Sequence, residues 1–387
     1  MAIEQHELGP DYATHPGEML AERIGFFNYE NEDVAMRLGI TPKHLSNIVN
    51  CKAGITAKTA LALERVFPGK SAESWLNGQQ RYDLFCARRT LRTSESEMGE
   101  ASEWLEYFDY DGLADMGYVP ALASGAEVAG KVSLLLEFFG CSSISAWQRV
   151  YGNAFEGVIG CGSCADMNPG NAIAWLRKGQ CQASPWFNRL PKFDRREFKR
   201  SLKRMGKRSS GFSNTAFRYG DKAFGWAKEL CAKSGVMLVC EPAPPKQSVQ
   251  SALFWSKRAP CIQVNSNLGT EDEFWFGFAC EAQHLLEADG KEAIIDMQEA
   301  VAGWLTAQDA CDWLLPAGPR CEFMRRGDFS KSSIVRFAAD FGVAEGLVVG
   351  WLQKQGVLAT ETPLNDMKSY VEYAVVPLAD LDSEYYA

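Results

Sequence analysis

A chain of 387 residues is long enough for two or three domains. Its composition, 46% hydrophobic and 23% charged, is typical of a soluble globular protein, and no apolar run approaches the roughly 20 residues that span a bilayer. Twelve cysteines without an N-terminal export signal indicate reduced thiols in the cytoplasm. The net charge of −9 argues against a protein coated in nucleic acid but leaves room for one basic face.

The first part of the chain predicts a run of short helices with well-marked ends. Thr41 and Thr56 are expected N-caps, Asn31 is a plausible one, Pro42 suits the first helical position, and Gly39 suits a tight turn. The segments that show helical spacing of apolar residues are GEMLAERIGFF (17–27), NEDVAMRLGI (31–40), TPKHLSNIVN (41–50), TAKTALALERVF (56–67) and SAESWLNGQQRYDLF (71–85).

The second and third of these segments have the features of a helix-turn-helix DNA reader. Leu38, Leu45 and Ile48 are expected to hold the pair against the core, which leaves the polar side of the third helix outward. The candidate contacts to base edges and phosphates are Thr41, Lys43, His44, Asn47, Asn50 and Lys52. The alternative is a plain helical bundle with a solvated polar face, but the series of caps and turns favours DNA binding.

Residues 11–87 resemble the HigA-type antitoxin branch of the Cro/repressor-like (XRE) helix-turn-helix family. The resemblance is carried by HPGEMLAERI, VAMRLGITPKHLSNIVNCKAGIT, TALALERVF and SAESWLNGQQRYDL. It implies a lambda-repressor-like helical bundle, a homodimer on palindromic operator DNA, repression of the protein's own operon and a small cognate toxin as partner. Cys51 departs from the family, which usually has Gly after the recognition helix.

The remainder of the chain predicts mostly helix with a small β element. Residues 88–165 are expected to form a helical linker region. Short strands are expected at Gly235–Cys240 and Cys261–Val264, followed by a helix over EFWFGFACEAQHLLE. We therefore expect an α+β domain at 166–316 and a helical segment at 317–387.

The sequence Cys280-Glu281-Ala-Gln-His284 approximates the H-E-x-x-H pattern of zinc peptidases, in which two ligands one helical turn apart flank a general base. The region around it resembles the ImmA/IrrE metallopeptidase family, with a zincin-like fold. Two departures suggest lost catalysis: Cys280 replaces the first His, and alignment of the next helix places Leu305 at the third ligand position. Acidic residues near that position, none at the family's spacing, are Glu299, Asp309 and Asp312.

We therefore expect no catalytic residue and no cofactor, with Cys280, Glu281 and His284 as vestiges of a site. A zinc ion held by Cys280, His284 and a carboxylate is the less favoured alternative. Cysteine is a good zinc ligand, but its thiolate would make the metal's water a poorer nucleophile, which argues against catalysis at such a site. Two other functions stay open: a zinc-dependent protease tethered to DNA, and a toxin-less regulator that senses a ligand or phage protein through its C-terminal domain.

Two weaker signals are interpreted as structural. The pair Cys161 and Cys164 in CGSC has no visible partner pair and is read as a coincidence. The basic run Pro191–Arg208 contains Asp194 and Glu197, which favours a solvated helix face over a contact with DNA phosphates.

Overall fold

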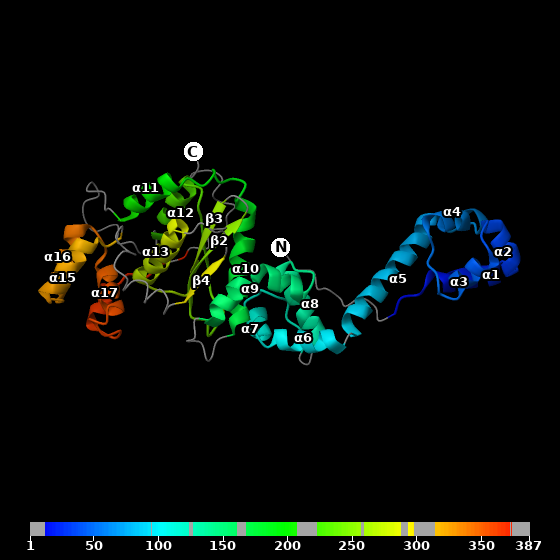
Figure 1. The fold of residues 1–387 in the computed structure, drawn as a ribbon, viewed down its shortest axis with the longest axis horizontal. Coiled ribbons are helices and arrows are strands. Elements are labelled where there is room, and N and C mark those ends of the chain that lie inside the picture. Colours follow the sequence, from blue (N-terminus) through cyan, green and yellow to red (C-terminus); the bar gives the residue numbers. More distant parts are fainter. Residues whose placement is uncertain are drawn as a thin grey trace. The chain divides into compact units, whose positions relative to one another are not determined.

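The computed structural model describes residues 12–93, 95–123, 127–160, 168–206, 223–256, 259–287, 293–297, 314–371 and 373 (Figure 1). The chain divides into two compact units, Met1–Glu100 and Ala101–Ala387. Among the described residues no single helix is long and apolar enough to cross a membrane. One pair of helices, Val128–Phe139 and Ile144–Ile159, reaches that length and composition together, but the two are bent by 57° relative to each other.

The first unit is a bundle of helices around one apolar core. The buried side chains come from every helix of the bundle and include Leu20, Val34, Leu45, Leu63 and Trp75. Its helices are α1 (Pro16–Phe26), α2 (Asn31–Leu38), α3 (Pro42–Val49), α4 (Ala57–Val66) and α5 (Ala72–Thr93).

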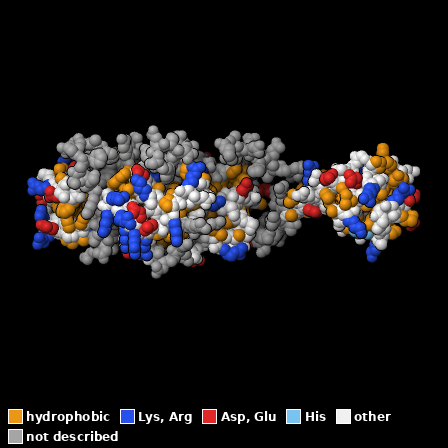
Figure 2. Space-filling view, turned by 90° about the horizontal axis from the view of Figure 1, so that it is seen from above, with side chains coloured by type: hydrophobic (Ala, Val, Ile, Leu, Met, Phe, Trp, Pro, Cys, Tyr) orange, Lys and Arg blue, Asp and Glu red, His pale blue; other side chains and the backbone are white. Residues whose placement is uncertain are grey.

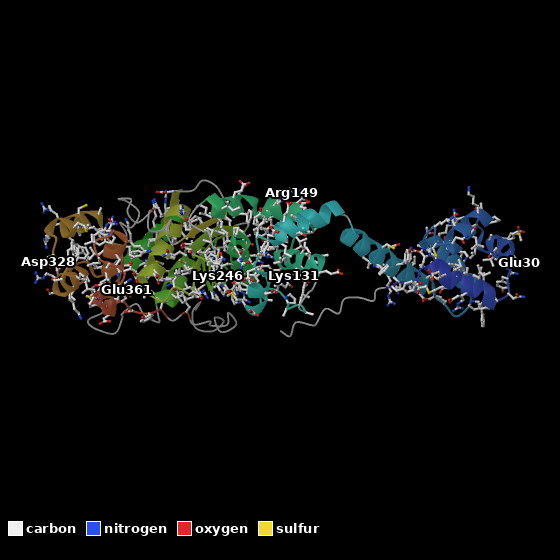
Figure 3. The ribbon with its side chains drawn as sticks, turned by 90° about the horizontal axis from the view of Figure 1, so that it is seen from below. Glu30, Lys131, Arg149, Lys246, Asp328 and Glu361 are labelled. Carbon is white, nitrogen blue, oxygen red and sulfur yellow. The ribbon has the colours of Figure 1, made fainter. Side chains whose placement is uncertain are left out.

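The ends of these helices largely follow the local signals in the sequence. Thr41 and Thr56 cap α3 and α4, each accepting a backbone N–H at the third position of its helix. Gly39 ends α2 with φ +67°, in the left-handed region that glycine adopts at low cost. The N-cap of α2 is Glu30 (labelled in Figure 3), whereas Asn31 is the first helical residue, so the expectation for Asn31 was wrong by one position.

The second unit contains a four-stranded sheet with helices on both faces (Figure 1). The helices are α6 (Glu95–Leu105), α7 (Tyr110–Asp115), α8 (Val128–Phe139), α9 (Ile144–Gly160), α10 (Pro169–Ala183), α11 (Arg195–Gly206), α12 (Ala223–Lys233), α13 (Glu271–Glu287), α15 (Ala317–Arg326), α16 (Lys331–Phe341) and α17 (Glu345–Lys354), with 3-10 turns at Ser184–Trp186 and Pro363–Met367.

The strands are β1 (Met237–Glu241), β2 (Val249–Ser256), β3 (Ala259–Asn265) and β4 (Ile294–Met297), in the order β1-β3-β2-β4. β1 runs parallel to β3, while β2 is antiparallel to both β3 and β4. The two expected strands are β1 and β3, whereas β2 and β4 were not expected from the sequence. β4 lies at the edge of the sheet, where it pairs with β2 through Ala252↔Ile295 and Leu253↔Ile294.

Alternate residues of the strands belong to two different cores. Leu238 and Ile262 pack with α11–α13 and α15–α17, whereas Met237 and Val239 pack with α6–α10. This is the period of two expected for a strand buried on both faces. Helices from the expected linker region thus cover one face of the sheet, and α13 covers the other.

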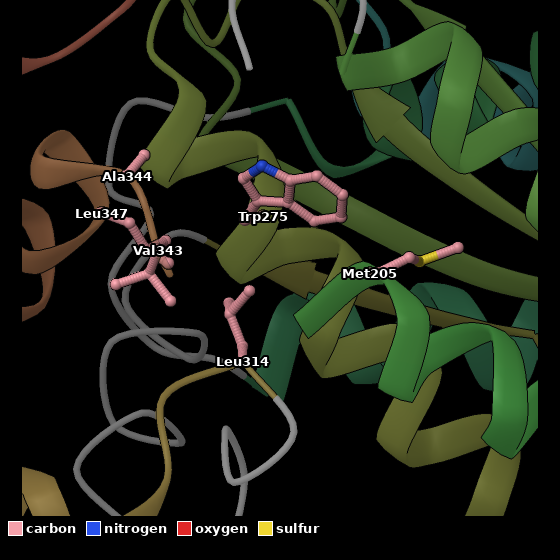
Figure 4. Close-up of a pocket in the computed structure, with 6 residues that line it drawn as sticks. All are labelled: Met205, Trp275, Leu314, Val343, Ala344 and Leu347. Carbon is pink, nitrogen blue, oxygen red and sulfur yellow. The ribbon is translucent and has the colours of Figure 1, made fainter. Parts of the chain in front are cut away.

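The C-terminal segment closes over the start of α13. Lys368 Nζ lies 2.7 Å from Asp272 Oδ2 in a nearly buried ion pair. A small apolar pocket in this unit is lined by Met205, Trp275, Leu314, Val343, Ala344 and Leu347 (Figure 4). The position of α13, which carries the CEAQH motif, is therefore fixed by the sheet on one side and by the C-terminal helices on the other.

Candidate functional sites

The outer side of α3 presents the predicted DNA contacts. Leu45 and Ile48 are buried in the core of the first unit and Val49 packs against it, so the polar side of this two-turn helix faces outward. Thr41, Lys43, Asn50 and Lys52 are exposed, while His44 and Asn47 are half-buried. Ser46 is exposed on the same helix and was not singled out from the sequence, although it lies three residues after Lys43.

Two of these side chains also hold the helix ends. Thr41 Oγ1 accepts the backbone N–H of His44 at 3.1 Å, which leaves its hydroxyl proton for an acceptor outside the helix. Asn50 Nδ2 donates to Ser46 O at 2.8 Å and lies 3.2 Å from Ser46 Oγ. The amide of Asn50 is therefore tied to the C-terminal end of α3, and its role includes the shape of that end.

The start of α1 packs closely against the end of α3. His15 is the N-cap of α1, and its Nδ1 accepts the backbone N–H of Gly17 at 2.8 Å. A Cβ atom at Gly17 would lie 1.9 Å from Ile48 O, so only glycine permits this approach. The edge of His15 also meets Tyr82 of α5, with ring centroids 4.5 Å apart. These contacts fix α3 relative to the rest of the bundle.

The turn after α3 has a residue in the left-handed region. Cys51 has φ +59°, a conformation that costs a non-glycine residue energy. Lys52 N and Ala53 N donate to Asn47 O at 2.7 and 3.1 Å, which closes the turn. The position at which the chain departs from the family pattern is thus one where the backbone itself favours glycine.

The second site lies where α13 meets the edge strand β4. Cys280 and His284, one helical turn apart, share a face of α13, and β4 supplies Asp296. Cys280 Sγ and His284 Nε2 each lie 3.0 Å from Asp296 Oδ2, and 3.7 Å from each other. These three are the described residues whose side chains come close enough together to hold a metal ion.

The charges of this cluster depend on one another. Burial alone would raise the pKa of Asp296, but hydrogen bonds from His284 and Cys280 hold it below its ordinary value. The hydrogen bond to Asp296 in turn raises the pKa of His284, against the opposing effect of burial. Asp296 is therefore an anion that faces two groups, Cys280 and His284, whose protons a metal cation can displace.

Glu281, at the general-base position of the motif, is wholly enclosed. Its side chain is 0% exposed, and burial, followed by the nearby charge of Asp296, raises its pKa well above the ordinary value. The predicted third-ligand position Leu305 and its acidic neighbours Glu299, Asp309 and Asp312 lie outside the described residues. The sequence pattern does not point to Asp296, because the resemblance implies a third ligand on a helix, whereas strand pairing brings this residue to the site.

The basic run identified in the sequence forms α11, an amphipathic helix. Phe198, Leu202 and Met205 are buried in the core, and the other side carries lysines and arginines. Figure 2 shows such a gathering of blue side chains on the second unit. Asp194 Oδ1 accepts the backbone N–H groups of Arg196 and Glu197, and Glu197 pairs with Arg200 at 2.5 Å. The pair Cys161 and Cys164 lies outside the described residues.

Comparisons with known proteins concern about a fifth of the chain, its N-terminal eighty or so residues. No protein-family model matches. The chain is 42% identical over 78 residues to virulence-associated protein I of Dichelobacter nodosus, which covers 20% of this chain and 71% of that protein. It is 31% identical over 84 residues to the uncharacterized HTH-type transcriptional regulator YddM of Escherichia coli strain K12, and this match covers 21% of this chain and 88% of that protein. Among solved structures, an addiction module antidote protein of the HigA family from Coxiella burnetii is 39% identical, covers 20% of this chain and 85% of that chain, and has a TM-score of 0.20.

Proposed function

Because this chain belongs, through its N-terminal eighty or so residues, to a family of HTH-type transcriptional regulators, we propose that it regulates transcription by placing α3 in the major groove of operator DNA. The observation that carries this proposal is the outer side of α3. It presents Lys43, His44 and Asn47 on a helix whose inner side is locked in the core. Donor-rich side chains at such positions read base edges and phosphates.

The finer part of the proposal is an antitoxin of the HigA type. The resemblance of residues 11–87 supports a homodimer on a palindromic operator, repression of the protein's own operon and a small toxin as partner. A toxin gene in the neighbouring reading frame would favour this assignment over a toxin-less regulator.

For the second unit we propose a peptidase-related domain that has no catalytic role. The support is the placement of the motif: a C-E-x-x-H helix packed on a small mixed sheet, as a zincin-like fold requires, with Glu281 wholly buried. A single observation favours the competing protease, namely that Asp296 completes a three-residue donor set with Cys280 and His284. In that alternative the helix-turn-helix unit tethers the enzyme to DNA.

The DNA-binding proposal is tested by footprinting the promoter upstream of the gene with purified full-length protein. Replacement of Lys43, His44 and Asn47 by Ala should each weaken specific binding, by about 1–3 kcal/mol at base-reading positions. Lys331→Ala, an exposed cation at the start of α16, is the control and should leave the footprint unchanged. A triple α3 variant that protects the promoter like the wild type would show that the assignment is wrong.

A further inference from the structure

We propose that Cys280, His284 and Asp296 bind one Zn²⁺ ion, in a site that joins α13 to the edge strand β4. The proposal concerns the second unit and does not depend on the DNA-binding function. It assigns Asp296 as a ligand supplied by a strand, in place of the acidic residue on a helix that the peptidase resemblance implies.

The three ligand atoms form a nearly regular triangle. The sides are 3.0, 3.0 and 3.7 Å, and the longest joins Cys280 Sγ to His284 Nε2. Ligand atoms about 2.0–2.3 Å from a tetrahedral Zn²⁺ lie roughly 3.3–3.6 Å from one another. Because sulfur forms the longest bond to zinc, the two sides that include Cys280 Sγ should be the longest. The side to His284 Nε2, 3.7 Å, meets this expectation, whereas the side to Asp296 Oδ2, 3.0 Å, must lengthen by roughly half an ångström. A small outward movement of Asp296 would fit the ion.

The geometry is that of a metal site and not that of a thiol nucleophile with its base. In a catalytic thiol–imidazole–carboxylate arrangement, one ring nitrogen of the histidine faces the thiol and the other faces the carboxylate. Here the same atom, His284 Nε2, faces both Cys280 and Asp296. Three ligand atoms that converge on one point cannot relay a proton along a line, but they can share one cation.

The donor set selects the metal. Mg²⁺ and Ca²⁺ prefer oxygen ligands, whereas a thiolate, an imidazole and a carboxylate together suit Zn²⁺. Binding displaces the Cys280 thiol proton to solvent and removes the proton from His284 Nε2, either to solvent or to Nδ1 of the same ring, so the ion meets two anionic ligands and one neutral one. Three protein ligands leave a fourth tetrahedral position for water.

The surroundings suit a stabilising site that solvent can reach. Cys280 is 1% exposed, whereas the side chains of His284 and Asp296 are 29% and 14% exposed. The ion thus has a buried anchor and an exposed side from which to enter. β4 has four residues and, among the described strands, pairs with β2 alone, so a shared ion adds a link between this strand and α13.

The test is metal analysis of the purified full-length protein after dialysis, with Co²⁺ substitution as an independent readout. The wild type should hold one zinc per chain, and its Co²⁺ form should show the near-ultraviolet charge-transfer absorption of a thiolate–cobalt bond. Cys280→Ser should lose that absorption, and Cys280→Ser, His284→Ala and Asp296→Asn should each weaken zinc binding by more than the 10–100-fold typical of changes around the ligands. Cys321→Ser, which removes an exposed thiol on α15, is the matched control and should keep the zinc and the absorption.

A measurement on the unmodified protein guards against variants that fail to fold. A chelator should lower the melting temperature of the wild type, and added Zn²⁺ should restore it, because an ion bound only by the folded state stabilises it. A wild type that retains no zinc, gives no thiolate–cobalt absorption and melts identically with and without chelator would overturn the proposal. Zinc retained in full by the Cys280→Ser and Asp296→Asn proteins would do so as well.

Discussion

His15 connects a titratable group to the stability of the DNA-binding unit. Its side chain is 3% exposed, and Nδ1 must be unprotonated to accept the N–H of Gly17. Burial lowers the pKa of His15 from its ordinary value of 6.5, and the nearby carboxylates Glu18 and Asp83 oppose that shift more weakly. An imidazole that is protonated less readily when folded makes the folded state sensitive to acid.

We expect the protection of α1 to fall as the pH falls below about 6.5. Because the pKa is lower in the folded state, the unfolded chain binds the proton more tightly. The stability from His15 is thus complete above the unfolded pKa and is lost as the pH falls through the folded pKa. The measurement is amide hydrogen exchange of the α1 peptide in the full-length protein, corrected for intrinsic rates. His15→Asn keeps an N-cap acceptor that does not titrate, and an identical acid response in that variant would exclude His15 as the cause.

At the scale of the element, the spacing between α1 and α3 depends on one glycine. Gly17→Ala would place a Cβ 1.9 Å from the backbone oxygen of Ile48, which cannot move without shifting the end of α3. We expect a loss of roughly 1–3 kcal/mol in the free energy of unfolding of this unit and weaker operator binding. Chemical unfolding and promoter footprinting measure the two effects.

The same helix supplies the control. Gly25 is exposed near the end of α1, and a Cβ there would meet nothing within 4 Å. Gly25→Ala should therefore be neutral or stabilise by up to about 1 kcal/mol, with DNA binding unchanged. Equal behaviour of the two alanine variants would show that the α1–α3 contact does not position the recognition helix.

How well the sequence predicts an element depends on whether its signals are local. The caps at Thr41 and Thr56 and the turn at Gly39 were predicted because each depends on neighbouring residues. β2, like β1 and β3, is buried on both faces, so its apolar residues do not alternate with polar ones; in addition, its one β-branched residue, Val249, is separated from its apolar run at 252–255 by Gln250 and Ser251. β4 has four residues, too few for a period to show.

The two sites differ for the same reason. The α3 residues are consecutive on one helix, so the sequence places them together, although it does not show that the Asn50 amide is held by Ser46. Cys280 and His284 are equally local, but Asp296 reaches them through the pairing of β4 with β2. Long-range pairing of that kind leaves no spacing that a single sequence can reveal.

At the scale of the whole molecule, the net charge of −9 constrains how the protein binds DNA. We expect a dimer whose two α3 helices lie about 34 Å apart, one turn of DNA. Because a local basic face must act against the charge of the rest of the chain, affinity should fall steeply as salt is raised. Binding isotherms from low to high salt, with the stoichiometry from analytical ultracentrifugation, measure both. A monomer on one half-site, or an affinity that is indifferent to salt, would contradict the dimer model.

The last prediction concerns whether the second unit performs chemistry. Glu281 occupies the position of a general base, but its side chain is wholly buried, and burial together with the nearby charge of Asp296 raises its pKa well above the ordinary value. A general base must reach the proton that it removes, and the Glu281 carboxyl has no contact with solvent in this structure. We therefore expect Glu281→Gln, which keeps the shape of the side chain, to leave the regulation of the promoter, the levels of partner proteins and the zinc content of the protein unchanged.

The comparison that decides between regulator and protease uses three proteins in cells: wild type, Glu281→Gln and His284→Ala. Promoter activity, the levels of partner proteins and the zinc content of each purified chain are measured together. His284→Ala should lose zinc, because it removes a ligand, while Glu281→Gln should resemble the wild type in every measurement. If Glu281→Gln retains zinc but loses regulation or the cleavage of a partner, the bound ion is catalytic, because this substitution alters the base and leaves the ligands in place. In that case the protease, not the regulator with a silent domain, is the correct description of the chain.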